Sequence, residues 1–361
     1  MSEIEDKKNS RTDKASVFAQ LTRRERFARA IQCLPVDYPP VWMMRQAGRA
    51  LPEYRELKES YSFVELVKTP DLAAEVTLQP IRRFDFDAAI IFSDILVIPE
   101  AMGQPYHFTD GNGVKMDFAI STYEDILKLN TSEVEQRLNY VFEALRIVRK
   151  TLGNKTALIG FAGSPWTLAN FMLEGGSSKS FEKARKLISS DRKSFELLMD
   201  KLTTAIIQYL DCQAKQGVDA VQIFDTLGWL LSENEFEAAS GMWIRKIVEA
   251  IKVKVPVIVF CKGVHKNWDE LISTGANAIG IDHNFSLAEA RRILPKSVAI
   301  QGNLDPELLR LDDPRPAVEQ TKLILSQMNG RNGFIFNLGH GVPQDARLRN
   351  IEEIIKIIRK D

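Results

Sequence analysis

Two arginines, Arg45 and Arg49, stand four positions apart in the stretch MMRQAGRALPEY, with Gln46, Ala47 and Gly48 between them. A guanidinium group is planar and can pair with a carboxylate through two parallel hydrogen bonds. Two such groups on one short turn could therefore clamp a ligand that carries several negative charges. A pair of solvated or structural arginines is the alternative, and the position of the stretch after a predicted strand favours ligand binding.

An acidic residue, Asp94, interrupts the apolar stretch AAIIFSDILVIP. A carboxylate that is buried without partners costs several kcal/mol. Asp94 must therefore be paired, exposed at the end of a strand, or functional. From the sequence alone, a salt bridge to a nearby arginine and a catalytic role are equally compatible with this position.

Polar residues and glycines also follow the other apolar runs. His340, between Gly339 and Gly341, could donate a hydrogen bond from a loop or simply occupy a turn. His107 and His265 have no comparable context, and the pair Asp282-His283 is left open because it follows a predicted strand. The remaining candidates at strand ends are Ser93, Ala162 to Trp166, Asp225, Thr226, Lys262, Gly263, Gly302 and Asn303.

Eight short apolar runs provide the elements that would position these residues. Each has the length of a strand, and each is continuous instead of alternating, as expected for parallel strands that are covered on both faces. The runs are Val41–Met44, Ala88–Phe92, Ala157–Phe161, Ala220–Phe224, Val257–Cys261, Ala278–Ile281, Val298–Gln301 and Phe334–Asn337.

Segments with helical periodicity separate the runs, and several of them end at a glycine such as Gly217 or Gly275. Alternation of eight strands with helices predicts an α/β fold, a single-domain (β/α)8 barrel. A doubly wound open sheet fits less well, because no GxGxxG or GxxxxGK[ST] motif is present. In a barrel of this kind the chemistry lies on the loops that follow the strands.

Two further segments have a distinct character. The stretch GQPYHFTDGNGVKMDF has turn residues between apolar runs, so we expect a hairpin inserted into a connection between a strand and a helix. Residues 1–16 carry acids and no apolar core, which predicts a disordered tail and not a signal peptide. Residues 17–361 would form the barrel.

The composition limits the classes of partner. The 361 residues are 45% hydrophobic and 27% charged, with 48 basic and 48 acidic side chains. This balance gives no overall field toward nucleic acid or an anionic membrane. The most apolar stretch, 88–102, is interrupted too soon to span a bilayer. Three scattered cysteines suit a reducing compartment, so we expect a soluble, cytoplasmic protein.

Six ordered motifs, each at a predicted strand end, resemble the uroporphyrinogen decarboxylase family. The similarity runs from about Val41 to the C-terminus. The motifs are MMRQAGRALPEYRELK, IIFSDILVIPEAMG, FAGSPWTLANFMLEGGSS, QIFDT, IQGNLDP and NLGHGV.

The resemblance implies a homodimeric (β/α)8 enzyme without cofactor or metal. Such an enzyme removes carbon dioxide from the four acetate side chains of uroporphyrinogen III and yields coproporphyrinogen III, in haem and tetrapyrrole synthesis. The family pattern implies substrate contacts for the segment from Arg45 to Arg49 with its Gln46, Ala47 and Gly48, and for Asp94, Phe171, Thr226 and His340. Arg45, Arg49 and Asp94 would be catalytic.

One position departs from the family pattern, because Phe171 stands where a tyrosine is usual. Its ring could still pack against a tetrapyrrole. A hydrogen bond from the missing hydroxyl would have to come from another group, and the neighbouring Asn170 is one candidate.

The implied chemistry needs no external electron sink, since a protonated pyrrole ring can accept the electrons that the departing carboxylate leaves behind. An ionised Asp94 facing the pyrrole N–H groups would stabilise the cationic ring more than the neutral ground state. The proton donor stays open between Arg45, Arg49 and His340.

Two alternatives remain. Corrinoid-linked methyltransferases share this type of barrel but typically hold zinc through a His-x-Cys pair, and here Val259 stands two positions before Cys261 with no later cysteine. A barrel that only binds a tetrapyrrole or a partner protein is the second alternative, and turnover would separate all three.

Overall fold

A computed structural model describes residues 21–109 and 113–360, and these form one α/β barrel. Seven parallel strands make a curled sheet in the order β1, β4, β5, β6, β7, β8, β9. Each strand pairs with the next strand of the sheet along the chain, which is the topology predicted from the apolar runs. The strands are β1 (Ala88–Ile90), β4 (Ala157–Gly163), β5 (Ala220–Asp225), β6 (Val257–Cys261), β7 (Ala278–Gly280), β8 (Ala299–Leu304) and β9 (Phe334–Leu338).

The first predicted strand, Val41–Met44, is wrong as a strand, although the segment occupies the first position of the barrel. Only one β-bridge forms, between Val41 and Phe336 of β9. On the other side, the Asp87 N–H donates to the Val41 carbonyl over 2.9 Å, so the segment closes the gap between β9 and β1.

Side chains replace the missing ladder bonds of this segment. The N–H of Val41 donates to Asp87 Oδ2 (3.0 Å), and the N–H of Met44 donates to Asn337 Oδ1 (2.9 Å). The N–H of Met43 donates to Gln46 Oε1 (3.0 Å). These side chains, and not the carbonyls of β9 or β1, accept from the three buried backbone donors, so the backbone is free to turn directly after Met44.

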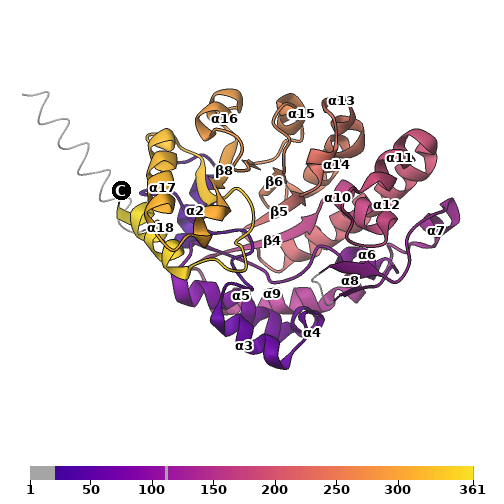
Figure 1. The fold of residues 1–361 in the computed structure, drawn as a ribbon, viewed down its shortest axis with the longest axis horizontal. Coiled ribbons are helices and arrows are strands. Elements are labelled where there is room, and N and C mark those ends of the chain that lie inside the picture. The colour runs from indigo at the N-terminus through magenta and orange to yellow at the C-terminus, as the bar shows by residue number, and fades with distance from the viewer. Residues whose placement is uncertain (1–20, 110–112, 361) are drawn as a thin grey trace, which may run out of the picture.

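Helices cover the outside of the sheet (Figure 1), as expected for strands whose residues are buried on both faces. The longest, α12, packs its apolar stripe against β4 and β5. The α-helices are α2 (Arg23–Ile31), α3 (Pro52–Ser60), α4 (Phe63–Lys68), α5 (Pro70–Phe84), α6 (Val97–Ala101), α7 (Tyr123–Lys128), α8 (Val134–Arg137), α9 (Asn139–Leu152), α10 (Pro165–Glu174), α11 (Glu182–Ser190), α12 (Arg192–Lys215), α13 (Glu233–Phe236), α14 (Met242–Ile251), α15 (Trp268–Ser273), α16 (Leu287–Ile293), α17 (Arg315–Met328) and α18 (Leu348–Lys360). Short 3-10 helices η1 (Gly228–Leu230) and η3 (Pro306–Arg310) and a π-helix, η2 (Glu237–Gly241), complete the set.

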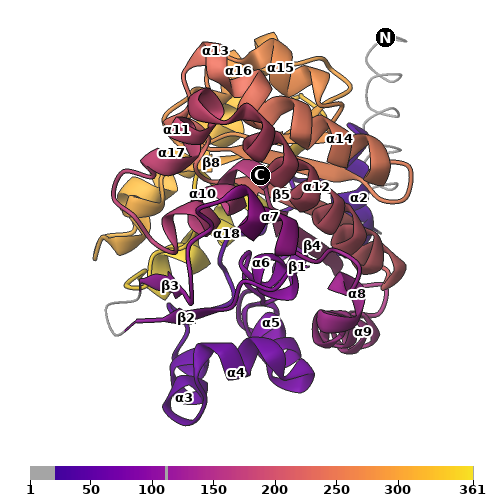
Figure 2. The same ribbon diagram turned by 90° about the vertical axis from the view of Figure 1, so that its right-hand side faces the viewer.

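The predicted hairpin is confirmed. Strands β2 (Tyr106–Phe108) and β3 (Val114–Met116) pair antiparallel with Tyr106 opposite Met116. Figure 2 shows this hairpin set apart from the barrel strands, on the side of α3 and α4. Its turn at 110–112 lies outside the described residues, as does the predicted tail at 1–16. Among the described helices, none is both long and apolar enough to cross a membrane.

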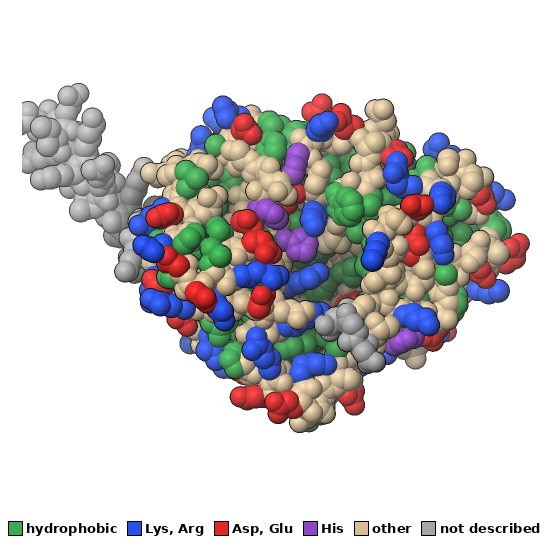
Figure 3. Space-filling view, viewed as in Figure 1, with side chains coloured by type: hydrophobic (Ala, Val, Ile, Leu, Met, Phe, Trp, Pro, Cys, Tyr) green, Lys and Arg blue, Asp and Glu red, His purple; other side chains and the backbone are tan. Residues whose placement is uncertain are grey.

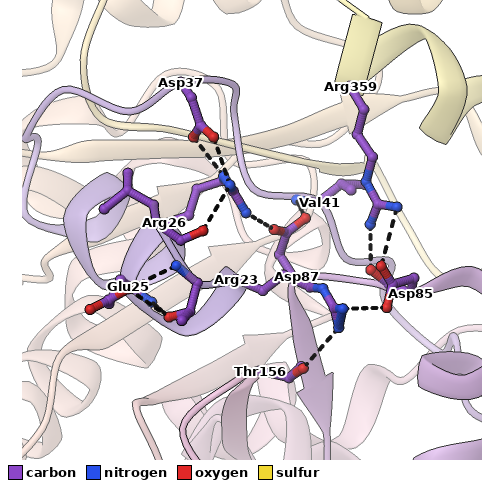
Figure 4. A network of polar contacts seen from close by, with 11 residues as sticks. Arg23, Glu25, Arg26, Asp37, Val41, Asp85, Asp87, Thr156 and Arg359 are labelled. Carbon is purple, nitrogen blue, oxygen red and sulfur yellow. Dashed lines mark hydrogen bonds and ion pairs between the residues drawn. The ribbon is translucent and has the colours of Figure 1, made fainter. Parts of the chain in front are cut away.

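A buried ion-pair network holds the segment Val41–Met44, which closes the barrel, at the amino-terminal end of β1 (Figure 4). Arg26 of α2 donates to Asp87 Oδ1 over 2.9 Å and to both oxygens of Asp37 over 2.7 Å. The Asp87 side chain is fully buried, and its other oxygen binds the Val41 N–H. One carboxylate therefore ties α2 and the base of β1 to the segment that completes the barrel.

Replacing Asp87 with asparagine should destabilise the protein strongly, because Arg26 would keep a buried charge with one partner fewer. Removal of one member of a buried ion pair typically costs about 3–5 kcal/mol. Urea unfolding followed by circular dichroism would measure the loss. Arg192→Ala, which breaks an exposed pair with Glu196, is the control and should leave the midpoint unchanged within error. An equally small effect of Asp87→Asn would contradict this role.

Candidate active site

A cavity of about 740 Å³ opens at the carboxyl ends of the strands, where a barrel places its functional residues. Of the nine predicted site residues, eight line it. In Figure 3, histidines gather beside basic side chains on one face of the molecule. The eight are Arg45, Ala47, Gly48, Arg49, Asp94, Phe171, Thr226 and His340.

Gln46 is the predicted residue that the structure keeps out of the cavity. It is buried, with its Oε1 accepting from the Met43 N–H and its Nε2 donating to the Ala88 carbonyl over 3.0 Å. Both ends of the amide are thus used within the barrel wall. Gln46 holds the arginine turn against β1 and does not face a ligand in this arrangement.

Arg45 lies at a strained position of that turn. The Gln46 N–H bonds the Met43 carbonyl over 2.9 Å, and Arg45 takes a left-handed φ of 60°. A residue other than glycine costs roughly 1–2 kcal/mol in this conformation. The turn aims the Arg45 side chain into the open mouth of the cavity, where the residue remains exposed to solvent. Desolvation of its guanidinium, then the charge of Arg49, lowers its pKa.

Two glycines of the NLGHGV motif make room for this arrangement. A Cβ on Gly341 would collide with the Arg45 side chain, and a Cβ on Gly339 would collide with the His283 backbone. The loop after β9 can therefore pack directly on both neighbours. The same loop places His340 in the cavity wall.

Arg55 of α3 is a supporting residue that the sequence did not reveal. Its Nε donates to the Arg49 carbonyl over 3.0 Å, and its Nη2 donates to the Gln344 carbonyl over 3.1 Å. It links the arginine turn to the loop after β9. Arg55 lies within the motif MMRQAGRALPEYRELK, but its place on α3, beyond the strand end, gave no signal for contacts to these backbone oxygens.

Asp94 is half-buried in the cavity wall and has no ion-pair partner among the residues that the structure describes. Its Oδ1 accepts a 2.7 Å hydrogen bond from the Leu96 N–H. Burial raises the pKa of this carboxyl, while the Leu96 N–H and the charge of Arg45 oppose that rise. The structural salt bridge left open by the sequence does not form, so the carboxylate is available to a ligand.

His340 is not suited to donate a proton at neutral pH. Burial, followed by the positive charges of Arg45 and Lys262, lowers the pKa of its imidazole to about 4. The ring is therefore neutral at neutral pH and can serve as a hydrogen-bonding group. Of the proton donors left open by the sequence, the arginines remain.

Phe171 lies on α10, a helix that starts directly after β4. Ser164 caps it by accepting from the Thr167 N–H over 3.0 Å, and Gly175 ends it with a φ of 77°. The Phe171 ring packs edge-on against Phe181 and faces the cavity. Asn170 is fully buried, its Nδ2 donates to the Trp166 carbonyl, and it is not part of the cavity wall. It does not replace the missing tyrosine hydroxyl there.

The loop after β5 is set by a buried carboxylate. Asp225 accepts hydrogen bonds from the hydroxyls of Ser164 (2.8 Å), Thr167 (2.8 Å) and Ser240 (2.6 Å). Thr226, the next residue, lines the cavity. Asp225 thus joins the ends of β4 and β5 beneath the cavity and has a structural role.

Basic residues not predicted as site residues also line the cavity. Lys262 and His283 follow β6 and β7, and Arg310 lies at the rim, where it pairs with Glu307 (3.1 Å) and Asp345 (3.0 Å). In the sequence, Lys262 and His283 follow predicted strands, and this position was the feature that could have identified them as cavity residues. Arg310 lies on η3, beyond the strand end.

The cavity does not provide a metal-binding set. In the described ranges, no three His, Cys, Asp or Glu side chains are grouped to hold a metal ion. Cys261, at the end of β6, is buried and its pKa is raised by burial. A thiol in this state does not favour metal ligation.

Replacing Arg45 should reveal the strain of its turn. We expect Arg45→Gly to be more stable than Arg45→Ala by up to about 1 kcal/mol, because alanine keeps a Cβ at a left-handed φ. At Lys58 in α3 the order should reverse, with glycine less stable than alanine by about 1 kcal/mol. Thermal unfolding of the four variants would decide, and a glycine penalty at both positions would refute the strained turn.

Asp94→Asn should raise the unfolding temperature at neutral pH. A raised carboxyl pKa means that the folded protein holds an unfavourable charge above that pKa. The gain should shrink as the pH falls and should vanish below the ordinary carboxyl pKa of about 3.9, where both states are protonated. Asp313, whose pKa is lowered by its hydrogen bond from Arg315, is the control, and Asp313→Asn should be destabilising at neutral pH. A destabilised Asp94→Asn would contradict the unpaired carboxylate.

Comparison with known proteins identifies the family of this chain. The family model described as uroporphyrinogen decarboxylase matches residues 22–360. A uroporphyrinogen decarboxylase of Pectobacterium atrosepticum is 44% identical over 330 residues, which is 90% of this chain and 93% of the relative. One of Pseudoalteromonas atlantica is 42% identical over 344 residues, which is 94% of this chain and 97% of the relative.

Among solved structures, a methyltransferase from Methanosarcina mazei superposes with a TM-score of 0.81 at 18% identity, covering 94% of this chain and 99% of its own. At that identity the likeness concerns the fold alone. The family model and the curated relatives carry the assignment: the chain belongs to the uroporphyrinogen decarboxylase family.

Proposed function

We infer that this protein decarboxylates uroporphyrinogen in tetrapyrrole biosynthesis, removing its four acetate carboxyl groups to give coproporphyrinogen. The observation that carries this function is an unpaired carboxylate, Asp94, in a cavity whose wall also holds Arg45 and Arg49. The family membership of nearly the whole chain supports the same reaction.

The arginine pair binds carboxylate groups at the rim of the macrocycle. Both side chains come from one turn, which Gln46 and Arg55 hold in place. Fixing the substrate at its periphery leaves the pyrrole N–H groups facing Asp94. Apolar residues of the same wall, among them Phe92, Phe171 and Phe224, offer surface for the rings.

Asp94 stabilises the charge that develops during the reaction. Protonation of a pyrrole α-carbon makes the ring cationic, the C–C bond to the carboxylate breaks, and its electrons flow into the ring. Protonation of the resulting methylene gives a methyl group. A fixed anion that meets charge only in the transition state lowers the barrier, and no cofactor is needed as electron sink.

Arg45 is the proton donor that the electrostatics favour. Free arginine is a very weak acid. Desolvation at the cavity mouth and the neighbouring Arg49 lower the pKa of Arg45, which makes its proton easier to release, whereas His340 is already neutral at neutral pH. We assign Thr226 and His340 to hydrogen bonds with peripheral groups, and Phe171 to packing.

The corrinoid-linked methyltransferase alternative loses support. The Methanosarcina mazei structure shares the fold only. Val259 occupies the position where a zinc-binding histidine would stand, and the described residues supply no zinc site.

Anaerobic incubation of the pure protein with reduced uroporphyrinogen, without added metal or cofactor, should yield coproporphyrinogen, detected as fluorescent porphyrin after oxidation. Asp94→Asn should bind substrate but lower kcat by roughly 100- to 1,000-fold, since it loses a preorganised electrostatic partner. Asp313→Asn makes the same exchange outside the cavity and should turn over normally. Tight binding without product would indicate a binding protein, and nearly normal turnover by Asp94→Asn would refute its role.

We further propose that the protein is a cytoplasmic homodimer. The assignment follows the family resemblance, and three free cysteines among the described residues are consistent with a reducing compartment. Sedimentation velocity would measure the oligomeric state, and a monomer at micromolar concentration would contradict it.

A further inference from the structure

Lys262 lines the cavity but has no part in the mechanism described so far. It is half-buried, and no acidic side chain of the described residues forms an ion pair with it. The cavity acids are Asp94 and Glu307, and Glu307 pairs with Arg310. A partly desolvated ammonium group without a counter-ion is poised to bind an anion from solution.

The barrel places Lys262 across the mouth from the arginine turn. The closing segment at Val41 occupies the first position, between β9 and β1, and β6 is the fifth position around the barrel. Arg45 and Arg49 follow the first position, and Lys262 follows the fifth. In a barrel of eight positions these two are diametrically opposed.

The backbone at Lys262 is fixed before any ligand arrives. Its N–H donates to the Asp225 carbonyl over 3.0 Å, and the N–H of Gly263 donates to Asp282 Oδ2 over 2.7 Å. Gly263 has a φ of 73°, and a Cβ there would collide with Trp229. The loop therefore holds its lysine at a defined place on the wall.

The acid at the end of the next strand does not neutralise Lys262. Asp282 accepts from the N–H groups of Gly263 and Asn284 and contacts His265 Nε2 over 2.8 Å. Burial opposes its charge, but these hydrogen bonds lower the pKa of Asp282 to about 2. His283, directly after it, lines the cavity with a buried Nδ1 that lacks a hydrogen-bond partner within the described chain.

We propose that Lys262 is a second carboxylate anchor, which binds a side-chain carboxylate on the side of the macrocycle opposite the ring held by Arg45 and Arg49. The assignment rests on the proposed function, because a ligand with carboxylates around its whole rim can meet cations on both sides of the mouth. Two opposed anchors fix the position of the macrocycle over Asp94 better than one.

Lys262→Met retains most of the side-chain length but removes the charge. Loss of a hydrogen bond to a charged group should raise KM for uroporphyrinogen about tenfold or more. The anchor holds ground state and transition state alike, so kcat should change less than about threefold. A KM within about twofold of wild type would overturn the proposal, as would a loss confined to kcat.

Two further variants separate the anchor from a structural role. Lys266→Met removes the next lysine of the same loop, which pairs with Glu233 outside the cavity, and KM should stay unchanged. Lys262→Arg keeps a cation and should restore most of the affinity. Circular dichroism and thermal unfolding would verify that Lys262→Met is folded. A KM that rises equally in Lys266→Met and Lys262→Met would show a loop effect and overturn the anchor.

The product distinguishes the two kinds of carboxylate. Coproporphyrinogen retains the propionates but has lost the acetates, so its inhibition constant should weaken as much as KM if Lys262 holds a propionate. An unchanged inhibition constant beside a raised KM would assign an acetate. Wild-type protein without turnover would refute the proposed function instead, and quenching of protein fluorescence by uroporphyrin would still test whether Lys262 binds carboxylate.

Discussion

The active face depends on how the described part of the chain closes its barrel with seven strands and one irregular segment, Val41–Met44. Asp87, Gln46 and Asn337 accept the N–H groups that a neighbouring strand would otherwise satisfy. Because these acceptors are side chains, the backbone can leave the extended conformation directly after Met44 and turn at Arg45. A regular strand continued through this point would alternate its side chains between interior and exterior. Because side chains replace the backbone hydrogen bonds of a strand here, the end of the segment can form the turn that carries Arg45 and Arg49.

Charge is distributed unevenly in the mouth of the barrel. Asp282, at the end of β7, is held mainly by Gly263 and His265 of the neighbouring loop after β6. Glu307, at the rim, pairs with Arg310, whereas Asp94 stays unpaired beside basic residues. The folded protein therefore maintains an unfavourable carboxylate where a cationic intermediate would be most favourable. The unpaired carboxylate lowers the stability of the folded protein at a position where it serves function. The buried pair of Arg26 and Asp87 stabilises the opposite end of the barrel.

The sequence was sufficient for the barrel because each strand is a continuous apolar run with polar residues at its end. The same rule located the cavity wall, since the carboxyl ends of parallel strands converge. It failed for Val41–Met44, where side-chain acceptors replace a strand, and it did not reveal that the Gln46 amide is used inside the wall. It also missed the role of Arg55, because this residue lies on α3, beyond the strand end, and its contact with the Gln344 carbonyl joins segments far apart in the sequence.

Among the described residues, Asp94 is the acid of the cavity wall without an ion pair, and this one group must serve four rings that each carry one acetate. The macrocycle has to present its rings in succession, by pivoting in the mouth or by leaving and returning. Each decarboxylation removes one carboxylate from the macrocycle, so the protein binds each successive intermediate more weakly. Intermediates that have lost few acetate carboxylates should thus stay bound for the next decarboxylation, and those that have lost most of them should dissociate most readily.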